Sequence, residues 1–441
     1  MHHARRELTG VFLTKTGGGT RDEGAGVGNH LRHAASYTTP PVAASVNCDA
    51  FPGCEIIRNF QNHRMQPTVT TFLQQLVRIP SVNPDNDAAA GITGERTLAV
   101  FLAEWLESIG AMVVLEEVKP GRPNLIARFS PMDGRPRILL GPHLDTVGVE
   151  GMTIDPFGGK IRDGRLRGRG ACDTKGPMAA MLWALRENRE LLANLPVAVD
   201  FVAFMGEESG QWGSKDFAQR HAAEYQFAIV GEPTSMEIVH VTKGSLWATL
   251  RATGVAVHSS MPERGENAIL KLTRSLDRLD GHLGEKLAAF THTELGRSTL
   301  NIGVIRGGSR PNIVPDLAEA ELDIRLTPSL AAAGGALKLL QDTIHELGAP
   351  VEILRPHENP PMETAPDHPM IRRLQEAGPD AKLAGAPWFS DAAHLSNAGV
   401  PAICIGPGSI DQAHTADEFI EVRALEQGAE FFSRFLRGLA C

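Results

Sequence analysis

The chain has 441 residues, of which 42% are hydrophobic and 22% are charged, and its formal net charge at pH 7 is −9. This length favours two domains, because single hydrophobic cores rarely grow beyond about 250–300 residues. The acidic balance argues against nucleic-acid binding, which needs a basic surface, and no apolar run approaches the about 20 residues of a membrane span, so no membrane partner is expected.

Residues 1–64 differ from the rest of the chain. They are rich in Gly, Thr, Ala and His and show no sustained hydrophobic period, which predicts a disordered or loosely attached extension. The five cysteines of the chain are odd in number and scattered, which favours a reducing, cytoplasmic location over a disulfide framework. A metal site on Cys48 and Cys54 is a minor alternative, since no second pair of ligands stands nearby.

From residue 68 onward, hydrophobic periodicity predicts a regular succession of helices and strands. Helices are expected at 68–77, 93–108 (with Thr93 as a candidate cap), 178–189, 267–279, 330–347, 367–376, 390–397 and 422–436. Strands are expected at 112–118, 124–129, 137–141, 197–205, 227–230, 246–257, 299–305, 318–326, 351–354 and 401–405.

The order of these elements predicts two architectures. Strands alternate with helices in 65–242 and the pattern resumes in 357–441, which favours an α/β domain with a mostly parallel sheet and helices on both faces. Between them, 243–356 has the order β-α-β-β-α-β, which is typical of a small α+β domain. The sequence therefore predicts one α/β domain interrupted by an inserted α+β domain.

Charged side chains recur where the predicted strands of the α/β domain end. They are His143, Asp145, Asp173, Glu207, Glu208 and Glu232, joined by His414 in the late stretch GPGSIDQAHTADEFIE. Because the carboxyl ends of parallel strands meet at one edge of a sheet, these residues are expected to converge. Gathering so many carboxylates is costly unless cations compensate them. Two divalent ions would do so, and His and carboxylate ligands suit zinc or cobalt.

Each of these residues, taken alone, has a commoner explanation. A histidine after a strand is usually a polar loop residue, an aspartate in a Gly-rich loop usually forms an Asx-turn, and two glutamates at a strand end usually face solvent. Only their joint occurrence at successive strand ends favours the metal site.

The ordered motifs HLDTV, DPF, GRGACDTKG, GEES, GEPT and AHTADEF resemble those of the co-catalytic zinc aminoacylase/carboxypeptidase family. That family includes acetylornithine deacetylase, succinyl-diaminopimelate desuccinylase and glutamate carboxypeptidase. The resemblance covers about residues 68–437 and implies a di-zinc peptidase-like fold in which the inserted domain serves as a lid and a dimerisation domain.

The resemblance also implies roles for the convergent residues. Asp173 would bridge two zinc ions, His143 and Glu232 would complete the ligands of one ion, and Glu208 and His414 those of the other, with cobalt as a substitute metal. Asp145 would orient His143. Glu207 would be the general base that takes a proton from the metal-bound water and gives it to the leaving amine. The peptide bond between Asp173 and Thr174 would be cis.

In the inserted domain, the resemblance implies that His258 reaches into the active site of a partner chain in a homodimer and helps to hold the oxyanion. Asn312 and Arg325 match positions that bind the carboxylate or carbonyl of the substrate, and Gly408 would allow a close backbone approach. A strand salt bridge is an equally open interpretation of Arg325, and a loop or capping role is the alternative for His258.

These features together predict a homodimeric, zinc-dependent amidohydrolase whose substrate is a small N-acyl amino acid. The stretch GPGSIDQAHTADEFIE looks most like acetylornithine deacetylase, so N-acetylornithine is the first expected substrate. A succinyl-diaminopimelate desuccinylase and a glutamate-type carboxypeptidase or dipeptidase are the alternatives within the class. A non-catalytic metal- or ligand-binding protein on the same fold and a hydrolase with one metal are the alternatives outside it.

Overall fold

The computed structural model describes residues 67–86, 92, 94–378 and 380–440, and these all belong to one compact unit. The expected N-terminal extension, Cys48, Cys54 and the candidate cap Thr93 lie outside the described residues. Within the described part of the chain, no helix combines the length and the apolar character needed to cross a membrane.

A nine-stranded sheet forms the larger of the two main sheets, with the order β1-β2-β6-β3-β7-β17-β8-β15 and with β16 paired to β8. Its middle strands, β6, β3, β7 and β17, pair in parallel, and β1 and β2 extend it in antiparallel fashion. The expected parallel sheet is therefore confirmed at the centre. The strands are β1 Met112–Lys119, β2 Arg122–Arg128, β3 Arg137–Leu140, β6 Ala198–Ala203, β7 Phe227–Val230, β8 Ile238–Thr242, β15 Met362–Glu363, β16 Leu383–Ala386 and β17 Ala402–Cys404.

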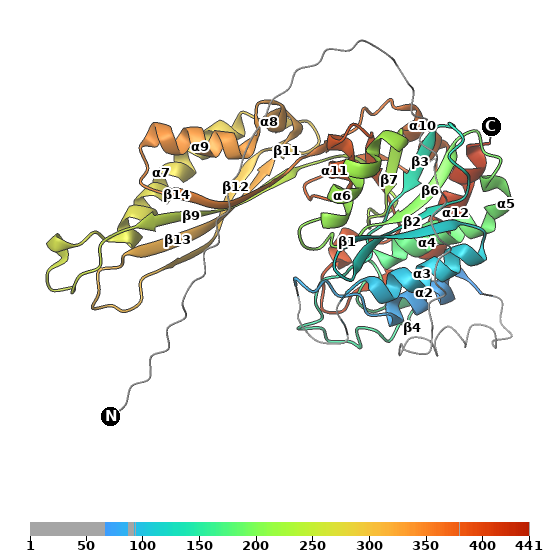
Figure 1. Ribbon diagram of the computed structural model, residues 1–441, viewed down its shortest axis with the longest axis horizontal. Coiled ribbons are helices and arrows are strands. Elements are labelled where there is room, and N and C mark those ends of the chain that lie inside the picture. Colours follow the sequence, from blue (N-terminus) through green and yellow to red (C-terminus); the bar gives the residue numbers. More distant parts are fainter. Residues whose placement is uncertain (1–66, 87–91, 93, 379, 441) are drawn as a thin grey trace, which may run out of the picture. The chain divides into compact units, whose positions relative to one another are not determined.

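Helices cover both faces of this sheet (Figure 1), because its central strands are apolar on both sides. In β3, Ile138 and Leu140 belong to the core on one face, while Leu139 belongs to the core on the other. The helices of the first core are α2 Val69–Arg78, α3 Arg96–Ser108, α4 Lys175–Glu187, α10 Pro369–Ala377 and α12 Val422–Gly438. Those of the second are α6 Trp212–His221 and α11 Ala392–Asn397.

The start of α2 illustrates how the sequence sets a helix boundary. The side chain of Thr68 accepts a hydrogen bond from the backbone N–H of Thr71, and the side chain of Thr71 accepts one from the N–H of Thr68. This reciprocal capping satisfies two N–H groups that have no partner inside the helix. Residues Phe72, Leu73 and Leu76 then recur at helical spacing and are buried.

The inserted segment forms a separate four-stranded antiparallel sheet in the order β12-β13-β9-β14. Two long helices pack on one face of it and enclose a third core, as Figure 1 shows. The proposed division at 243 falls just before β9, whereas β14 runs past the proposed division at 356 to Asn359. The elements are β9 Gly244–Thr253, α7 Ala268–Ala288, β12 Thr299–Gly307, β13 Leu317–Leu326, α8 Pro328–Ala332, α9 Gly335–Leu347 and β14 Glu352–Asn359.

The remaining short elements lie in connections. A three-stranded sheet joins β18 Phe419–Glu421, β5 Arg165–Arg167 and β4 Lys160–Arg162, and a small hairpin joins β10 Thr291–His292 to β11 Gly296–Arg297. The short helices are α5 Arg189–Leu192, η3 Ala222–Glu224, η4 Pro262–Arg264 and η5 Ile410–Gln412.

Several predicted boundaries were wrong for local reasons. The helix expected at 330–347 is two helices, because Gly334 and Gly335 both have positive φ (111° and 89°) and end α8 before α9 begins. The helix expected at 267–279 continues to Ala288. Strand β16 was not predicted because its sequence, LAGA, contains residues that are depleted in strands.

Candidate metal centre and adjacent cleft

Three of the predicted ligands converge at the carboxyl edge of the parallel strands. His143 follows β3, Asp173 lies just before α4, and Glu208 follows β6. Each offers one ligand atom, and these atoms all lie within 4.8 Å of one another. Residues that are 65 positions apart in the chain therefore share one site because neighbouring parallel strands end at the same edge.

Asp173 faces two histidines, one with each carboxylate oxygen. Its Oδ1 lies 3.0 Å from Nε2 of His143, and its Oδ2 lies 3.4 Å from Nε2 of His414. His414 also lies 3.0 Å from Oε2 of Glu208. Burial alone would raise the pKa of Asp173, but the hydrogen bonds from the two histidines outweigh burial and hold its pKa well below the ordinary value. The carboxylate is therefore placed to serve two cations at once.

Among the predicted ligands, two further carboxylate oxygens are buried without a hydrogen-bond partner within the described residues. They are Oε1 of Glu208 and Oε1 of Glu232, which follows β7. Burial raises the pKa of both carboxyl groups, and the negative charge of Asp173 raises both further. Since unpaired buried carboxylates are costly, divalent cations with oxygen and imidazole ligands fit this set of residues.

The carboxylate of Asp145 holds the turn that carries both glutamates. Its oxygens accept hydrogen bonds from the backbone N–H groups of Glu207 (2.9 Å) and Glu208 (3.0 Å), and one also accepts from Nδ2 of Asn83 (2.7 Å). His143 Nδ1 instead donates to the backbone oxygen of Asp145 at 2.9 Å and lies 3.6 Å from its carboxylate. If a cation took the place of the proton on Nε2, the bond from Nδ1 would keep the ring oriented and Nε2 would be its ligand atom. Asp145 thus positions the glutamates as well as the histidine.

Glu418 ties the loop before α4 to a distant part of the chain, and sequence reasoning missed it. Its buried carboxylate accepts from the backbone N–H groups of Gly170 (3.2 Å), Cys172 (2.9 Å) and Asp173 (3.0 Å). The guanidinium of Arg169 lies 2.6 Å away and supplies a counter-charge. The available signal was its place in the motif AHTADEF, four residues after His414. The peptide bond between Asp173 and Thr174 is cis.

Asp391, at the start of α11, is a second residue that sequence reasoning missed. Its carboxyl group is fully buried and accepts a hydrogen bond from the hydroxyl of Ser214. Burial raises its pKa to about 7, and the negative charge of Asp145 adds to that shift. Because nothing in the sequence around it carries a metal-ligand pattern, only the folded chain reveals it.

Glu207 and Glu208 lie at the wall of a cleft of about 660 Å³. The same cleft is lined by Arg325 of the inserted sheet and by several aromatic side chains. Burial raises the pKa of Glu207 well above its ordinary value, and the charges of Asp391, Glu232 and Glu208 raise it further. A carboxyl group with a raised pKa beside a cleft holds a proton more readily than an ordinary glutamate, which suits it to proton exchange with a ligand in that cleft.

The other predicted residues lie elsewhere. Asn312 and His258 are neighbours in the inserted segment, where the N–H of Ser259 donates to the oxygen of Asn312 at 3.1 Å, and neither lines the cleft. Gly408 has a φ of 96°, and a Cβ there would lie 2.6 Å from Sγ of Cys172. Position 408 therefore favours glycine, because its positive φ strains other residues and a Cβ would collide with Cys172.

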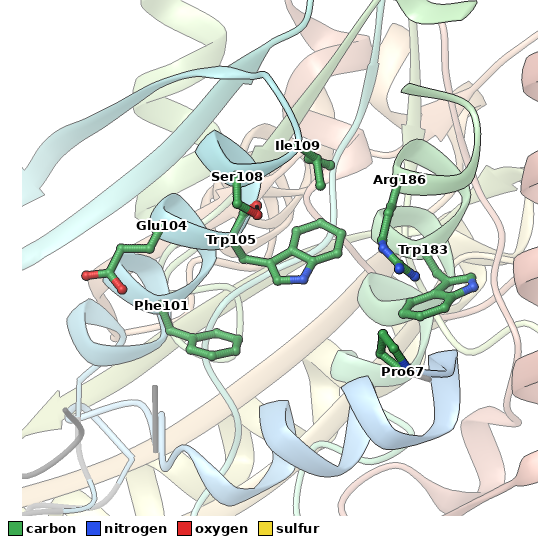
Figure 2. Close-up of a pocket in the computed structure, with 8 residues that line it drawn as sticks. All are labelled: Pro67, Phe101, Glu104, Trp105, Ser108, Ile109, Trp183 and Arg186. Carbon is green, nitrogen blue, oxygen red and sulfur yellow. Dashed lines mark hydrogen bonds between the residues drawn. The ribbon is translucent and has the colours of Figure 1, made fainter. Parts of the chain in front are cut away.

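A second hollow, between α3 and α4, contains none of the predicted site residues (Figure 2). Trp105 and Trp183 border it, with Pro67 at its edge, as Figure 2 shows. Trp105 stacks on Phe72 with 4.6 Å between ring centroids, and the guanidinium of Arg186 covers Trp183. These contacts are those of a packed helix surface.

Comparison with known proteins gives a consistent set of similarities. Residues 139–438 match the model of the peptidase family M20/M25/M40. The chain is 33% identical over 386 residues to an acetylornithine deacetylase of Proteus mirabilis, covering 84% of this chain and 96% of that protein. It is 30% identical over 353 residues to an acetylornithine deacetylase of Vibrio cholerae, covering 78% of this chain and 92% of that protein.

Solved structures show the same fold at lower identity. An M20 family metallo-carboxypeptidase from Sulfolobus solfataricus superposes with a TM-score of 0.72 at 20% identity, covering 85% of this chain and all (100%) of that one. A dinuclear metal-binding peptidase of the M20 family from Bacillus subtilis superposes with a TM-score of 0.60 at 15% identity, covering 83% of this chain and 97% of that one.

Proposed function

The chain belongs to the peptidase family M20/M25/M40 and is a hydrolase acting on amides, and we propose that it removes the acyl group from an N-acyl amino acid. The observation that carries this proposal is the buried carboxylate of Asp173, which faces two histidines beside a cleft that also holds Glu207. N-acetylornithine is the proposed first substrate, because proteins 33% and 30% identical to this chain are named acetylornithine deacetylases.

The proposed site holds two divalent cations. Asp173 would bridge them, His143 and Glu232 would complete the ligands of one cation, and Glu208 and His414 those of the other. The buried, unpartnered oxygens of Glu208 and Glu232 support this assignment. We propose zinc, with cobalt as a substitute, because imidazole and carboxylate ligands suit both metals. When bound, such cations polarise a carbonyl and make water more acidic.

The protein's own residues would move the proton. Glu207 has no metal ligand role in this assignment and has a raised pKa, so its carboxylate can take a proton from the attacking water and deliver it to the leaving nitrogen. Asp145 would fix the backbone of Glu207 and Glu208 through its two N–H contacts. The base and a ligand would therefore be held in one rigid turn.

Release of free amine from a substrate panel tests the proposal. The panel contains N-acetylornithine, N-acetyl-lysine, N-succinyl-diaminopimelate, N-acetylmethionine and several dipeptides. We expect turnover of at least one acyl amino acid, its loss on chelation, and its return when zinc or cobalt is added back, since the proposed chemistry needs bound cations. Turnover that persists in excess chelator would contradict the metal-dependent mechanism. Saturation at one ion per chain would contradict the two-cation site.

The proposed homodimer is supported by the exposure of His258. Its imidazole contacts Ser260 at 2.8 Å within its own chain and lies outside the cleft, so it is available to a second chain. We expect His258→Ala to retain metal but lose turnover, and mixing it with Glu207→Gln chains to restore activity. Random pairing leaves one intact site in half of the dimers, which is about a quarter of wild-type activity. If mixed dimers form and stay inactive, the shared-site proposal is wrong.

A further inference from the structure

One face of the inserted sheet is turned toward the cleft, and the residues on it are polar or aromatic. The opposite face packs Leu246, Ala248 and Leu250 against the helices of the insertion, as the alternation of a β-strand requires. Cross-strand pairs place Ser245 beside Arg325 and Asn359, and Trp247 beside His357. Together with Arg355, these residues line the cleft that holds Glu207 and Glu208.

Arg355 occupies an irregular position in β14. The register between β14 and β9 shifts between Leu354 and His357, and Arg355 has a φ of 48°. Bulges of this kind occur beside active sites, where they redirect a side chain. A positive φ is uncommon for a residue other than glycine. The strand therefore departs from regular geometry at a residue that lines the cleft.

The guanidinium of Arg355 lacks an acidic partner within the described residues. The guanidinium donates a hydrogen bond to the neutral hydroxyl of Thr249 at 3.3 Å. Arg325, by contrast, is paired with Asp323 at 2.9 Å. Lys119, which also lines the cleft, lies 3.6 Å from Asp85. Arg355 is thus the cleft arginine whose charge is available to a ligand.

The surroundings of Arg355 are also prepared for a ligand. Nζ of Lys215 lies 3.1 Å from Nε2 of His357, which lines the cleft. Lys215 therefore adds a second positive charge near the cleft. Asn359 is 5% exposed, and its Oδ1 has no hydrogen-bond partner among the described residues. An unsatisfied buried acceptor is unfavourable, and a donor group on a ligand would satisfy it. Trp247 leaves 56% of its surface exposed beside them, and a concave site with aromatic walls and a few polar groups is typical of small-molecule binding.

We propose that Arg355 binds a carboxylate group of the substrate, with Lys215 adding positive charge, Trp247 packing against the substrate, and Asn359 accepting from a substrate N–H. This inference rests on the proposed amide hydrolysis and goes beyond it by assigning Arg355 to a subsite for a substrate carboxylate. Two sources offer the same chemistry: the α-carboxylate of the amino acid, or a second carboxylate at the end of its side chain or acyl group. A guanidinium binds either carboxylate in a bidentate manner, with two parallel N–H···O hydrogen bonds.

Kinetics of Arg355→Gln test the subsite. The matched control is Arg306→Gln, which removes a 75% exposed arginine side chain from β12 of the same sheet and lies outside the cleft. Four substrates are compared: N-acetylornithine, its carboxamide analogue without an α-carboxylate, N-acetylglutamate and N-succinylornithine. Because hydrogen bonds to charged groups are the stronger ones, we expect Arg355→Gln to lower kcat/KM by about 10- to 100-fold for the substrate carrying the recognised carboxylate.

Comparison of the four substrates identifies which carboxylate Arg355 binds. If it is the α-carboxylate, Arg355→Gln is impaired on N-acetylornithine, and the wild type is equally impaired on the carboxamide. If it is the second carboxylate, the wild type prefers N-acetylglutamate or N-succinylornithine, and the variant loses that preference alone. Equal kcat/KM for Arg355→Gln and Arg306→Gln on all four substrates would overturn the proposal. Arg355→Lys keeps the positive charge but loses the paired N–H donors of the guanidinium. Its kcat/KM should lie between those of the wild type and Arg355→Gln.

A binding measurement separates this inference from the proposed function. Calorimetric titration of glutarate into the full-length, chelator-treated protein needs no hydrolysis. Binding to the wild type and to Arg306→Gln, with at least about tenfold weaker binding to Arg355→Gln, supports the subsite even if no amide in the panel is cleaved. Equal glutarate binding by all three proteins, or none by the wild type, would overturn it even if amide hydrolysis is established.

Discussion

Replacing Glu207 with glutamine is expected to abolish most amide hydrolysis while leaving the metal centre occupied. The glutamine keeps the size of the side chain but cannot take a proton from water or pass one to the leaving nitrogen. General acid–base catalysis typically contributes about 10²–10⁴-fold to a rate, so we expect kcat to fall by about three orders of magnitude. Steady-state release of free amine measures this loss on the best substrate of the panel.

The site geometry explains why this effect should fall on kcat. Glu208 approaches His414 at 3.0 Å and belongs to the ligand cluster. The carboxylate of Glu207, by contrast, has no hydrogen-bond partner in the described part of the chain and lines the cleft. Metal binding and substrate binding should therefore be retained in Glu207→Gln, because the residues assigned to them are unchanged. Equal metal content and a KM within a few-fold of the wild type are the expected companions of the lost kcat.

A control variant guards against a general effect of removing a glutamate. Glu187→Gln alters a half-exposed carboxylate of α4 that pairs with Arg186 at 3.3 Å, and it should keep wild-type kcat. The proposed role of Glu207 fails if Glu207→Gln and Glu187→Gln have the same kcat. It fails in a different way if Glu207→Gln loses metal along with activity, because Glu207 would then be a ligand.

The sequence predicted those elements and residues whose role depends on a short stretch of sequence, such as an apolar run or a motif. The apolar run of β6 was recognisable because both faces of a central parallel strand are buried. The convergence of His143, Asp173 and Glu208 followed from their positions after parallel strands. The family membership was recognisable from ordered short motifs and agrees with the match over residues 139–438.

The residues that were missed act through contacts between distant parts of the chain. Glu418 is 245 residues from Asp173, and only folding brings its carboxylate within hydrogen-bond distance of the loop that ends at Asp173. Arg355 lies beyond the strand expected at 351–354, because a bulge interrupts the pairing of β14 with β9 after Leu354 and the pairing resumes at His357. Periodicity cannot report a bulge of this kind, since the extra residue breaks the alternation on which the prediction depends.

Glu418 provides the largest expected effect on stability, through the Glu418→Gln variant. The side chains of Glu418 and Arg169 are 0% and 3% exposed, and the substitution leaves Arg169 buried without its counter-charge. Breaking a buried pair by removing one partner costs about 3–5 kcal/mol. The three N–H groups of the loop also lose a charged acceptor. We expect a lower Tm and, because Asp173 is no longer fixed, about 10- to 100-fold weaker metal binding.

The matched control, Glu421→Gln, separates the buried carboxylate from an exposed one in β18, the strand that begins directly after Glu418. Glu421 pairs with Arg165 at 2.7 Å, but the two side chains are 48% and 42% exposed, and exposed pairs contribute about 1 kcal/mol or less. Thermal denaturation with and without added zinc, together with metal titration, compares the two variants. If they share the same Tm and the same metal affinity, Glu418 does not hold the Asp173 loop. If only Glu418→Gln loses both, the stability of this loop and the affinity of the metal centre depend on one carboxylate that is not itself a ligand.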